Sequence, residues 1–399
     1  MESIRKNSNL KELHLDKEAI ATLSLAREGI LKPIDKLMNE SESEEIYKTH
    51  IYKGQFLPFP FILAPAGRRN KEVLKNAKKG EILKLVSNNK IKGYIEVDSV
   101  YKIDINRRIK AIFGTDNKTH PGVKDTLKRL GEYAVCGDYD IEFDDIKNVK
   151  QKINNAKKQI NAQKTTAIMM AAKPLHRAHE RLIRLTLEDT DLLVIFLLKP
   201  YKKDILSYGI RYKTLEYFVD NFLPKNRVLV VPFENTYIFA GYNNAVLDSL
   251  AAKNFGCSHI ILGQNHSGIG IFYNHDRINS IMDKVSKSGI DVDIVSEFVY
   301  CNQCKTLVST KTCPHGKHHH ISYHSPSILE ILKAGLLPPA VLVRKEISAI
   351  ILSELFKNRF KGLSKIYDSV MPGNGLLEEH SEKDFYIKLL ELYQTTSLT

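Results

Sequence analysis

Five short, nearly all-apolar runs constrain the fold of this chain more than any other feature. They cover residues 166–171, 192–198, 227–232, 258–262 and 291–295. Strands of this composition are buried on both faces, which is typical of parallel sheets. Segments with helical periodicity lie between them, at 177–188, 209–222, 243–255 and 274–287. The alternation predicts an α/β fold with a doubly wound parallel sheet, which binds its ligands at the carboxyl ends of the strands.

The seven residues Pro174 to Glu180, PLHRAHE, follow the first of these runs and open the next helix. His176 and His179 are three residues apart, so both rings lie on one helical face. Helix-start amides and the positive end of the helix dipole favour bound phosphate. Two imidazoles there could stabilise the charge that develops when a triphosphate is cleaved. A solvated or helix-capping pair is the alternative that the motif alone leaves open.

The regions on either side of the sheet have a different character. Residues 1–160 contain short alternating segments with Gly, Asn and Pro breaks, which predicts a β-rich domain with a few helices. The lysine-rich stretch 148–164 reads as a solvated helix or linker and marks the boundary. Residues 321–399 contain helical segments at 327–335 and 344–358, which predicts a small helical C-terminal subdomain.

Charge and hydropathy limit the partners and the location. The formal net charge is +13, which suits anionic partners such as nucleotides, oxyanions or nucleic acid. The charged N-terminus does not resemble a signal peptide, and no apolar run approaches the roughly 18 residues that span a bilayer. We therefore expect a soluble cytoplasmic protein with no membrane partner.

Three of the five cysteines lie close together, at Cys301, Cys304 and Cys313. An odd number of cysteines argues against a disulfide framework, and thiolates at this spacing with one imidazole suit a closed, structural zinc site. Free thiols beside a surface histidine tract are the alternative. The spacing leaves the fourth ligand between His318 and His319, with His315 and His320 less favoured. We place His319 in the ligand set.

Several motifs resemble those of ATP sulfurylases, the sulfate adenylyltransferases. PLHRAHE and the GQNHSGIG segment at 263–270 resemble the two nucleotide motifs of that family. FGT at 113–115 and HPGV at 120–123 are similar to the stretch that closes its PUA-like domain, and the cysteine motif resembles the zinc knuckle of some members. The resemblance implies a PUA-like domain at 1–160, a nucleotidyltransferase domain at 161–320 that ends in the knuckle, and a helical subdomain at 321–399.

The resemblance also implies roles for individual residues. His176 and His179 would be catalytic and contact the β and γ phosphates of ATP, whose Mg²⁺ counter-ion is the expected cofactor beside structural zinc. The acceptor oxygen would attack the α-phosphorus directly, in line, without a covalent enzyme intermediate. The nucleotide-binding residues would be Gly263, Gln264, Asn265, His266, Ile321 and Ser322. The acceptor-binding residues would be Met170, Ala172 and Lys173.

The chain departs from the family where sulfate is bound. The family's QTRN segment is here Met170 to Lys173, MAAK, and its GRDHAG loop is GQNHSG at 263–268, so both arginines are missing. Losing two charge-assisted hydrogen bonds would cost roughly 3–6 kcal/mol, or about two to four decades of affinity. Replacement charge could come from other basic residues, namely Lys173, Lys199, Lys202, Lys203 or Arg211.

Three functions therefore stay open. The first is a sulfate adenylyltransferase that makes adenosine 5′-phosphosulfate and pyrophosphate from ATP and sulfate. The second is a diverged adenylyltransferase with another acceptor, and the third is a catalytically silent relative that binds RNA or protein. Retention of both histidines favours an enzyme whose partners are ATP and a small oxyanion rather than nucleic acid. ATP sulfurylases commonly form oligomers, so the resemblance also allows a homo-oligomer.

Overall fold

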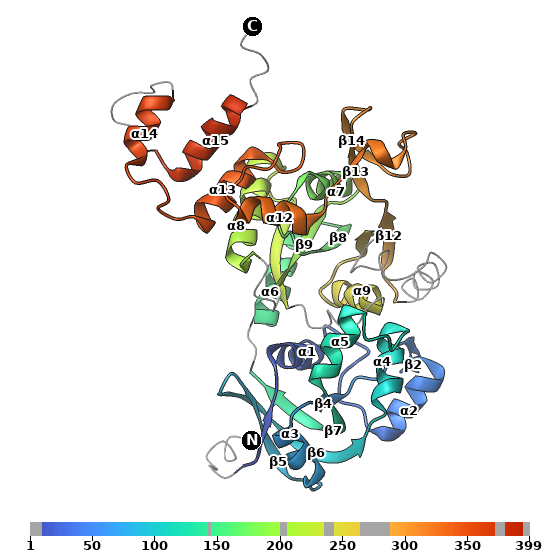
Figure 1. Ribbon diagram of the computed structural model, residues 1–399. Coiled ribbons are helices and arrows are strands. Elements are labelled where there is room, and N and C mark those ends of the chain that lie inside the picture. The colour runs from blue at the N-terminus through green and yellow to red at the C-terminus, as the bar shows by residue number, and fades with distance from the viewer. Residues whose placement is uncertain are drawn as a thin grey trace. The chain divides into compact units, whose positions relative to one another are not determined.

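Figure 1 shows the computed structural model of the chain, which describes residues 10–142, 145–199, 206–234, 243–263, 288–371 and 380–393. The chain forms two compact units. One unit comprises Met1–Met169 with Pro232–Ile294, and the other comprises Met170–Val231 with Val295–Thr399. Among the described helices, none is both long enough and apolar enough to cross a membrane.

A five-stranded sheet forms the centre of the N-terminal region. Its strands, in spatial order, are β1 (Glu12–His14), β5 (Ile82–Ser87), β6 (Lys90–Lys102), β7 (Leu130–Ile141) and β4 (Leu63–Pro65). Pairing is antiparallel except between β1 and β5. The helices of this region are α1 (Lys17–Arg27), α2 (Glu40–Thr49), α3 (Arg68–Lys75), α4 (Ile105–Phe113) and α5 (Pro121–Arg129), with a small hairpin of β2 (Ile51–Tyr52) and β3 (Gln55–Phe56). The expected β-rich, PUA-like domain is confirmed.

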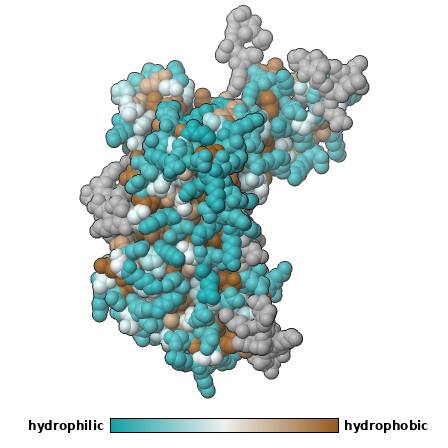
Figure 2. Space-filling view, turned by 180° about the vertical axis from the view of Figure 1, so that it is seen from behind, coloured by the Kyte–Doolittle hydropathy of each residue, from teal (hydrophilic) through white to brown (hydrophobic). Residues whose placement is uncertain are grey.

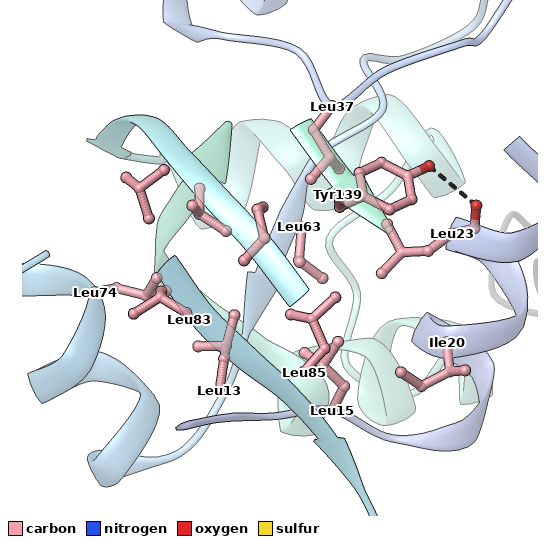
Figure 3. Close-up of a cluster of buried hydrophobic side chains, with 13 residues drawn as sticks. Leu13, Leu15, Ile20, Leu23, Leu37, Leu63, Leu74, Leu83, Leu85 and Tyr139 are labelled. Atoms are coloured by element: carbon pink, nitrogen blue, oxygen red, sulfur yellow. Dashed lines mark hydrogen bonds between the residues drawn. The ribbon is translucent and has the colours of Figure 1, made fainter. Parts of the chain in front are cut away.

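The core of this domain is formed by the sheet together with α1 and α3 (Figure 3). Leu13, Leu83 and Leu85 are fully buried, and each such side chain contributes about 1.5–3 kcal/mol by leaving water. Tyr139 is also buried, and its hydroxyl donates to the carbonyl oxygen of Leu23 at 3.0 Å. The phenol therefore joins β7 to α1 without leaving a buried polar group unpaired.

Helix α6 (Asp145–Gln159) occupies the lysine-rich stretch where a boundary was expected. It is not solvated all round, because Ile146, Val149 and Ile153 are buried along one stripe. Lys157 also donates to the carbonyl oxygen of Gly256 at 2.7 Å. The segment is thus an amphipathic helix packed within its unit.

The second large sheet has the strand order β10-β9-β8-β11-β12. Its strands are β8 (Thr165–Met170), β9 (Leu192–Lys199), β10 (Val228–Glu234), β11 (His259–Gly263) and β12 (Asp291–Val295), and β8 pairs with β11 in parallel. Chain order reverses at the β8–β11 pair, and ligands bind at such switch points beyond the carboxyl ends of the strands. All residues of β8 are buried, as the apolar pattern predicts. The predicted parallel sheet is confirmed.

Helices α7 (Arg177–Leu187), α8 (Tyr208–Phe222) and α9 (Asn244–Asn254) match three of the predicted helices to within one residue at every end. The fourth predicted helix, 274–287, lies outside the described residues. Strand β12 differs from the buried strand that was expected, because Asp291, Asp293 and Ile294 are exposed. Its position at the edge of the sheet explains the exposure.

The last part of the chain begins with a small antiparallel sheet of β13 (Phe298–Cys301), β14 (Thr306–Ser309) and β15 (His320–Ser322). Helices α12 (Ser325–Lys333), α13 (Lys345–Leu355), α14 (Leu363–Val370) and α15 (Glu382–Tyr393) follow, so the helical C-terminal region is confirmed. Tyr367, Met371 and Phe385 form a buried cluster between α14 and α15. Figure 2 shows hydrophobic residues scattered among hydrophilic ones on the face it displays.

Candidate active site and metal site

The turn from β8 into α7 carries the candidate catalytic residues. Strand β8 ends at Met170, and His176 is the N-cap residue of α7 with an extended backbone at φ −141°. Between them Ala172 has a positive φ of 45°, a conformation that residues with a side chain adopt rarely. Such strain persists only where the surroundings hold the backbone in place, and it is often found at functional sites.

His176 and His179 lie side by side, as their spacing predicts. Their rings are stacked with centroids 3.7 Å apart and an interplanar angle of 21°. The backbone N–H of His176 donates to Nδ1 of His179 at 3.3 Å, so the ring proton of neutral His179 is on Nε2. The pair is therefore a fixed structural unit at the start of the helix.

Both imidazoles are neutral at pH 7. Burial, with the neighbouring ring of His179, holds the pKa of His176 well below its usual value, and burial lowers the pKa of His179 to about 4. A neutral imidazole still has one N–H donor for a phosphate oxygen. The free site thus offers hydrogen-bond donors at the helix N-terminus rather than two positive charges.

Glu180 anchors this end of α7. Its carboxylate is buried and accepts from Arg344 at 3.1 and 2.7 Å, and from Arg177 at 3.0 Å. Arg344 is the N-cap residue of α13 and also lies over the ring of Phe222 at 3.9 Å. This charge-assisted network fixes the histidine-bearing turn to the C-terminal helices. No local pattern predicts the contact between Glu180 and Arg344, because these two residues are 164 positions apart in the sequence.

Arg211, one of the cations considered as a replacement, is fully buried in α8. Its guanidinium donates to three carbonyl oxygens, those of Ala171 at 2.6 Å, Leu198 at 2.8 Å and Leu206 at 3.0 Å. Burial lowers its pKa to about 10, so it stays charged. No carboxylate pairs with it among the described residues, and its Nη2 has no hydrogen-bond partner there. A positive charge therefore lies at the carboxyl ends of β8 and β9.

The predicted acceptor residues lie around this charge. Met170 and Ala172 are buried and have no polar side-chain atom, whereas Lys173 is half-buried. Arg211 binds the carbonyl group of Ala171, in the middle of the segment. Among the predicted acceptor residues, Lys173 therefore has the one polar side chain. Met170 and Ala172 can offer a ligand only their backbone groups.

The predicted nucleotide residues are only partly described. Gly263 ends β11, whereas Gln264, Asn265 and His266 lie outside the described residues. Ile321 and Ser322 are exposed in β15. The residues that follow them contact the histidine pair: the ring of Tyr323 stacks on His176 at 5.3 Å, and the hydroxyl of Ser325 lies 3.2 Å from Nε2 of His176. No motif distinguishes these two residues in the sequence.

A second cluster brings Cys301, Cys304, Cys313 and His315 together. Nδ1 of His315 lies 3.5, 3.3 and 3.6 Å from the three sulfur atoms, and all four ligand atoms are within 4.8 Å of one another. Tetrahedral zinc, with bonds of about 2.3 Å to sulfur and 2.0–2.1 Å to nitrogen, separates its ligand atoms by roughly 3.5–3.8 Å. The residues therefore fit a structural zinc ion, as the three cysteines predicted.

The fourth member of this cluster is His315 and not the predicted His319. His315 follows Cys313 after one proline, so its ring turns back onto the thiols. His319 ends the short 3₁₀ turn Lys317–His319 and packs on the rings of His318 at 4.1 Å and His315 at 6.0 Å. His320, which the spacing also disfavoured, lies with Nε2 3.3 Å from the sulfur of Cys313. The spacing in the sequence does not show which histidine ring the local turn directs toward the cysteine thiols.

Comparison with known proteins agrees with this architecture. A family model described as ATP-sulfurylase matches residues 144–354, and one described as PUA-like domain matches residues 1–142. Sulfate adenylyltransferases of Halothermothrix orenii and Carboxydothermus hydrogenoformans are 26% and 28% identical to this chain, over 88% and 87% of it and 94% and 92% of their own lengths.

Among solved structures, a hexameric APS kinase from Thiobacillus denitrificans is similar with a TM-score of 0.63 and 16% identity. The match covers 88% of this chain and 64% of that chain, and it shows a shared fold.

The fold, the histidine pair and these matches define a nucleotidyltransferase. The ATP-sulfurylase model spans more than half of the sequence, so this chain belongs to the ATP sulfurylase family. It is a divergent member, only 26–28% identical to these two relatives.

Proposed function

We propose that this protein transfers the adenylyl group of ATP to a small oxyanion, with sulfate as the first candidate, and releases pyrophosphate. The observation that carries the proposal is the stacked pair of His176 and His179 at the N-terminus of α7. Curated relatives that share most of the chain are sulfate adenylyltransferases. The pair also caps α7, since the backbone N–H of His176 donates to His179, so the assay below is needed to separate catalysis from capping alone.

The reaction follows from positioning and charge stabilisation. An acceptor oxygen attacks the α-phosphorus in line, the new P–O bond forms, and the electrons of the α–β bridging bond leave with pyrophosphate. N–H groups of the two imidazoles donate to the phosphates that leave, and the helix N-terminus adds its partial positive charge. Mg²⁺, bound mainly by phosphate oxygens and water, would neutralise the nucleotide. No protein nucleophile is required.

The acceptor would bind at the carboxyl ends of β8 and β9. Lys173 and the backbone of residues 170–173 would contact it, and the buried charge of Arg211 would favour an anion there. The loss of the family arginines favours a second candidate, an oxyanion other than sulfate. An ammonium group does not reproduce the two parallel hydrogen bonds of a guanidinium.

Pyrophosphate release tests the proposal. The wild type, His176→Asn and His179→Asn are compared with ATP, Mg²⁺ and a panel containing sulfate, selenate, molybdate and phosphate. We expect turnover with at least one anion and a roughly 10²–10³-fold lower kcat in each variant, as for loss of a transition-state hydrogen bond. Absence of pyrophosphate with every anion, combined with salt-sensitive RNA binding, would instead support a silent RNA-binding relative.

We also propose that Cys301, Cys304, Cys313 and His315 hold a structural zinc ion. Four protein ligands leave no position for a substrate, so the ion would stabilise β13, β14 and β15 rather than act in catalysis. The backbone N–H of Cys304 already points at the sulfur of Cys301 at 3.4 Å, which favours the thiolate.

A further inference from the structure

His176 is enclosed on all the sides that the structure describes. The residue is 6% exposed, and its ring lies between those of His179 and Tyr323. Nε2 lies 3.2 Å from the hydroxyl oxygen of Ser325. Nδ1 is buried and has no hydrogen-bond partner among the described residues. One ring nitrogen thus has a protein partner, and the other is buried with none among the described residues, which is a cost that a ligand contact would remove.

The position of the single ring proton decides what this unpaired nitrogen can do. With the proton on Nε2, that nitrogen donates to Ser325, and Nδ1 presents a lone pair. Phosphate oxygens at neutral pH are acceptors, so a lone pair at Nδ1 cannot bind them. With the proton on Nδ1, the hydroxyl of Ser325 donates to Nε2, and Nδ1–H can donate to a phosphate oxygen.

Ser325 is well placed to fix this choice. It is the first residue of α12, directly after the N-cap residue His324, so its side chain is held by the start of a helix. Tyr323 cannot take its place, because the Tyr323 hydroxyl donates to the carbonyl oxygen of Val341 at 2.8 Å. Within the described parts of the chain, Ser325 is the hydroxyl that contacts this ring.

We propose that Ser325 is a positioning residue whose hydroxyl donates to Nε2 of His176, holds the ring proton on Nδ1, and so keeps Nδ1–H available to the phosphates of the nucleotide. The inference rests on the proposed function and adds a residue that acts through His176. It extends the site from the β8–α7 turn to the start of α12, within one compact unit.

The matched variants lie on the same helix. Ser325→Ala removes the donor, and Ser325→Thr keeps a hydroxyl at the same position. Ser327→Ala is the control, because Ser327 is exposed and its hydroxyl bonds instead to Nδ1 of His324 at 2.8 Å. All three changes are small and lie at the start of an intact helix.

The first measurement is the tautomer, read from ¹⁵N chemical shifts of labelled histidine rings in the full-length protein without nucleotide. The His176 signals are assigned by their loss in His176→Asn. We expect the Nδ1–H form in the wild type, Ser325→Thr and Ser327→Ala, and a shift toward the Nε2–H form in Ser325→Ala. An Nε2–H form in the wild type, or no change in Ser325→Ala, would overturn the proposal.

The second measurement is steady-state kinetics with the best anion from the panel. We expect kcat of Ser325→Ala to fall about tenfold with an unchanged KM for the acceptor, and Ser325→Thr to recover most of it. Equal kcat values in Ser325→Ala and Ser327→Ala would count against the proposal. The tautomer measurement needs no turnover, so it can succeed even if the protein releases no pyrophosphate. In that case the proposed function would be refuted, whereas the role of Ser325 in placing the ring proton of His176 would be supported.

Discussion

At the scale of single residues, the site combines neutral donors with one buried positive charge. His176 and His179 are kept neutral by burial, whereas Arg211 is kept charged by its high intrinsic pKa and three carbonyl partners. Nucleotide and acceptor, both anions, would supply the charge that this arrangement lacks. Binding of these anions would therefore stabilise the folded protein.

The histidine pair predicts how stability depends on pH. In the folded protein both pKa values lie below the ordinary value of about 6.5, so between that pH and about 4 the unfolded chain binds more protons. Stability must fall as pH falls through this window. For His179 alone we expect a loss of about 2 kcal/mol between pH 7.5 and 5.0. Urea unfolding of the wild type and His179→Asn measures it, and equal losses in the two proteins would contradict the prediction.

Arg211 predicts a selective effect on the acceptor. Arg211→Met should raise the acceptor KM at least tenfold, because the charge and the support of Ala171 are both lost. Arg227→Met is a matched control, since Arg227 also binds backbone carbonyl oxygens, those of Leu187, Thr190 and Asp191, but near the amino ends of the strands. Steady-state kinetics separate the two, and a similar KM change in both variants would contradict a specific role.

At the scale of elements, the β8–α7 turn works because other elements hold it. The carboxylate of Glu180 ties α7 to α13, and the hydroxyl of Ser325 brings α12 to the ring of His176. The small sheet of β13, β14 and β15 leads directly into α12, with the cysteine cluster at its other end. The cysteine cluster and the candidate active site are therefore joined by one short stretch of chain.

The cysteine cluster predicts which histidine binds the metal. His315→Ala should release about one zinc per chain and lower the melting temperature, because folding and metal binding are coupled in such sites. His319→Ala should keep the zinc, since its ring lies against other histidines and not against the thiols. Metal analysis and thermal unfolding with and without a chelator measure both. Zinc loss in His319→Ala alone would restore the sequence-based ligand set.

At the scale of the whole molecule, the first compact unit is discontinuous in the chain. Residues 232–294 return to the unit formed by residues 1–169. Asn243, before α9, donates to the carbonyl oxygens of Ala111 and Ile112 at the end of α4. Asn254, at the end of α9, donates to those of Ile30 and Lys32. The PUA-like domain is thus completed by residues that follow far later in the sequence.

This arrangement predicts the behaviour of the isolated PUA-like domain. Residues 1–142 contain the whole five-stranded sheet and its core, so the fragment should fold. It should be less stable than the same region of the full chain by about 2–4 kcal/mol, because carbonyl groups at residues 30, 111 and 112 lose their partners. Hydrogen exchange of the β6 and β7 amides, followed by mass spectrometry across a denaturant series in both proteins, checks this. Equal stability would show that α9 contributes nothing.

The sequence by itself determined the secondary structure, the parallel sheet and the neighbouring histidines. These depend on local periodicity and spacing, which are written along the chain: the buried run of β8, the helix that begins after His176, and the pair three residues apart. The three cysteines likewise predicted a metal cluster through their short spacing.

Only the tertiary structure decided which distant groups meet. Ser325 against His176, Arg344 against Glu180, and Arg211 against the end of β8 join residues 40 to 164 positions apart. The sequence also did not predict that His315, rather than His319, lies beside the three thiols. The two histidines are close in the chain, and the direction of a single turn decides between them. Side-chain chemistry determines whether a residue can donate or accept a hydrogen bond. The packed fold determines which partner that residue meets.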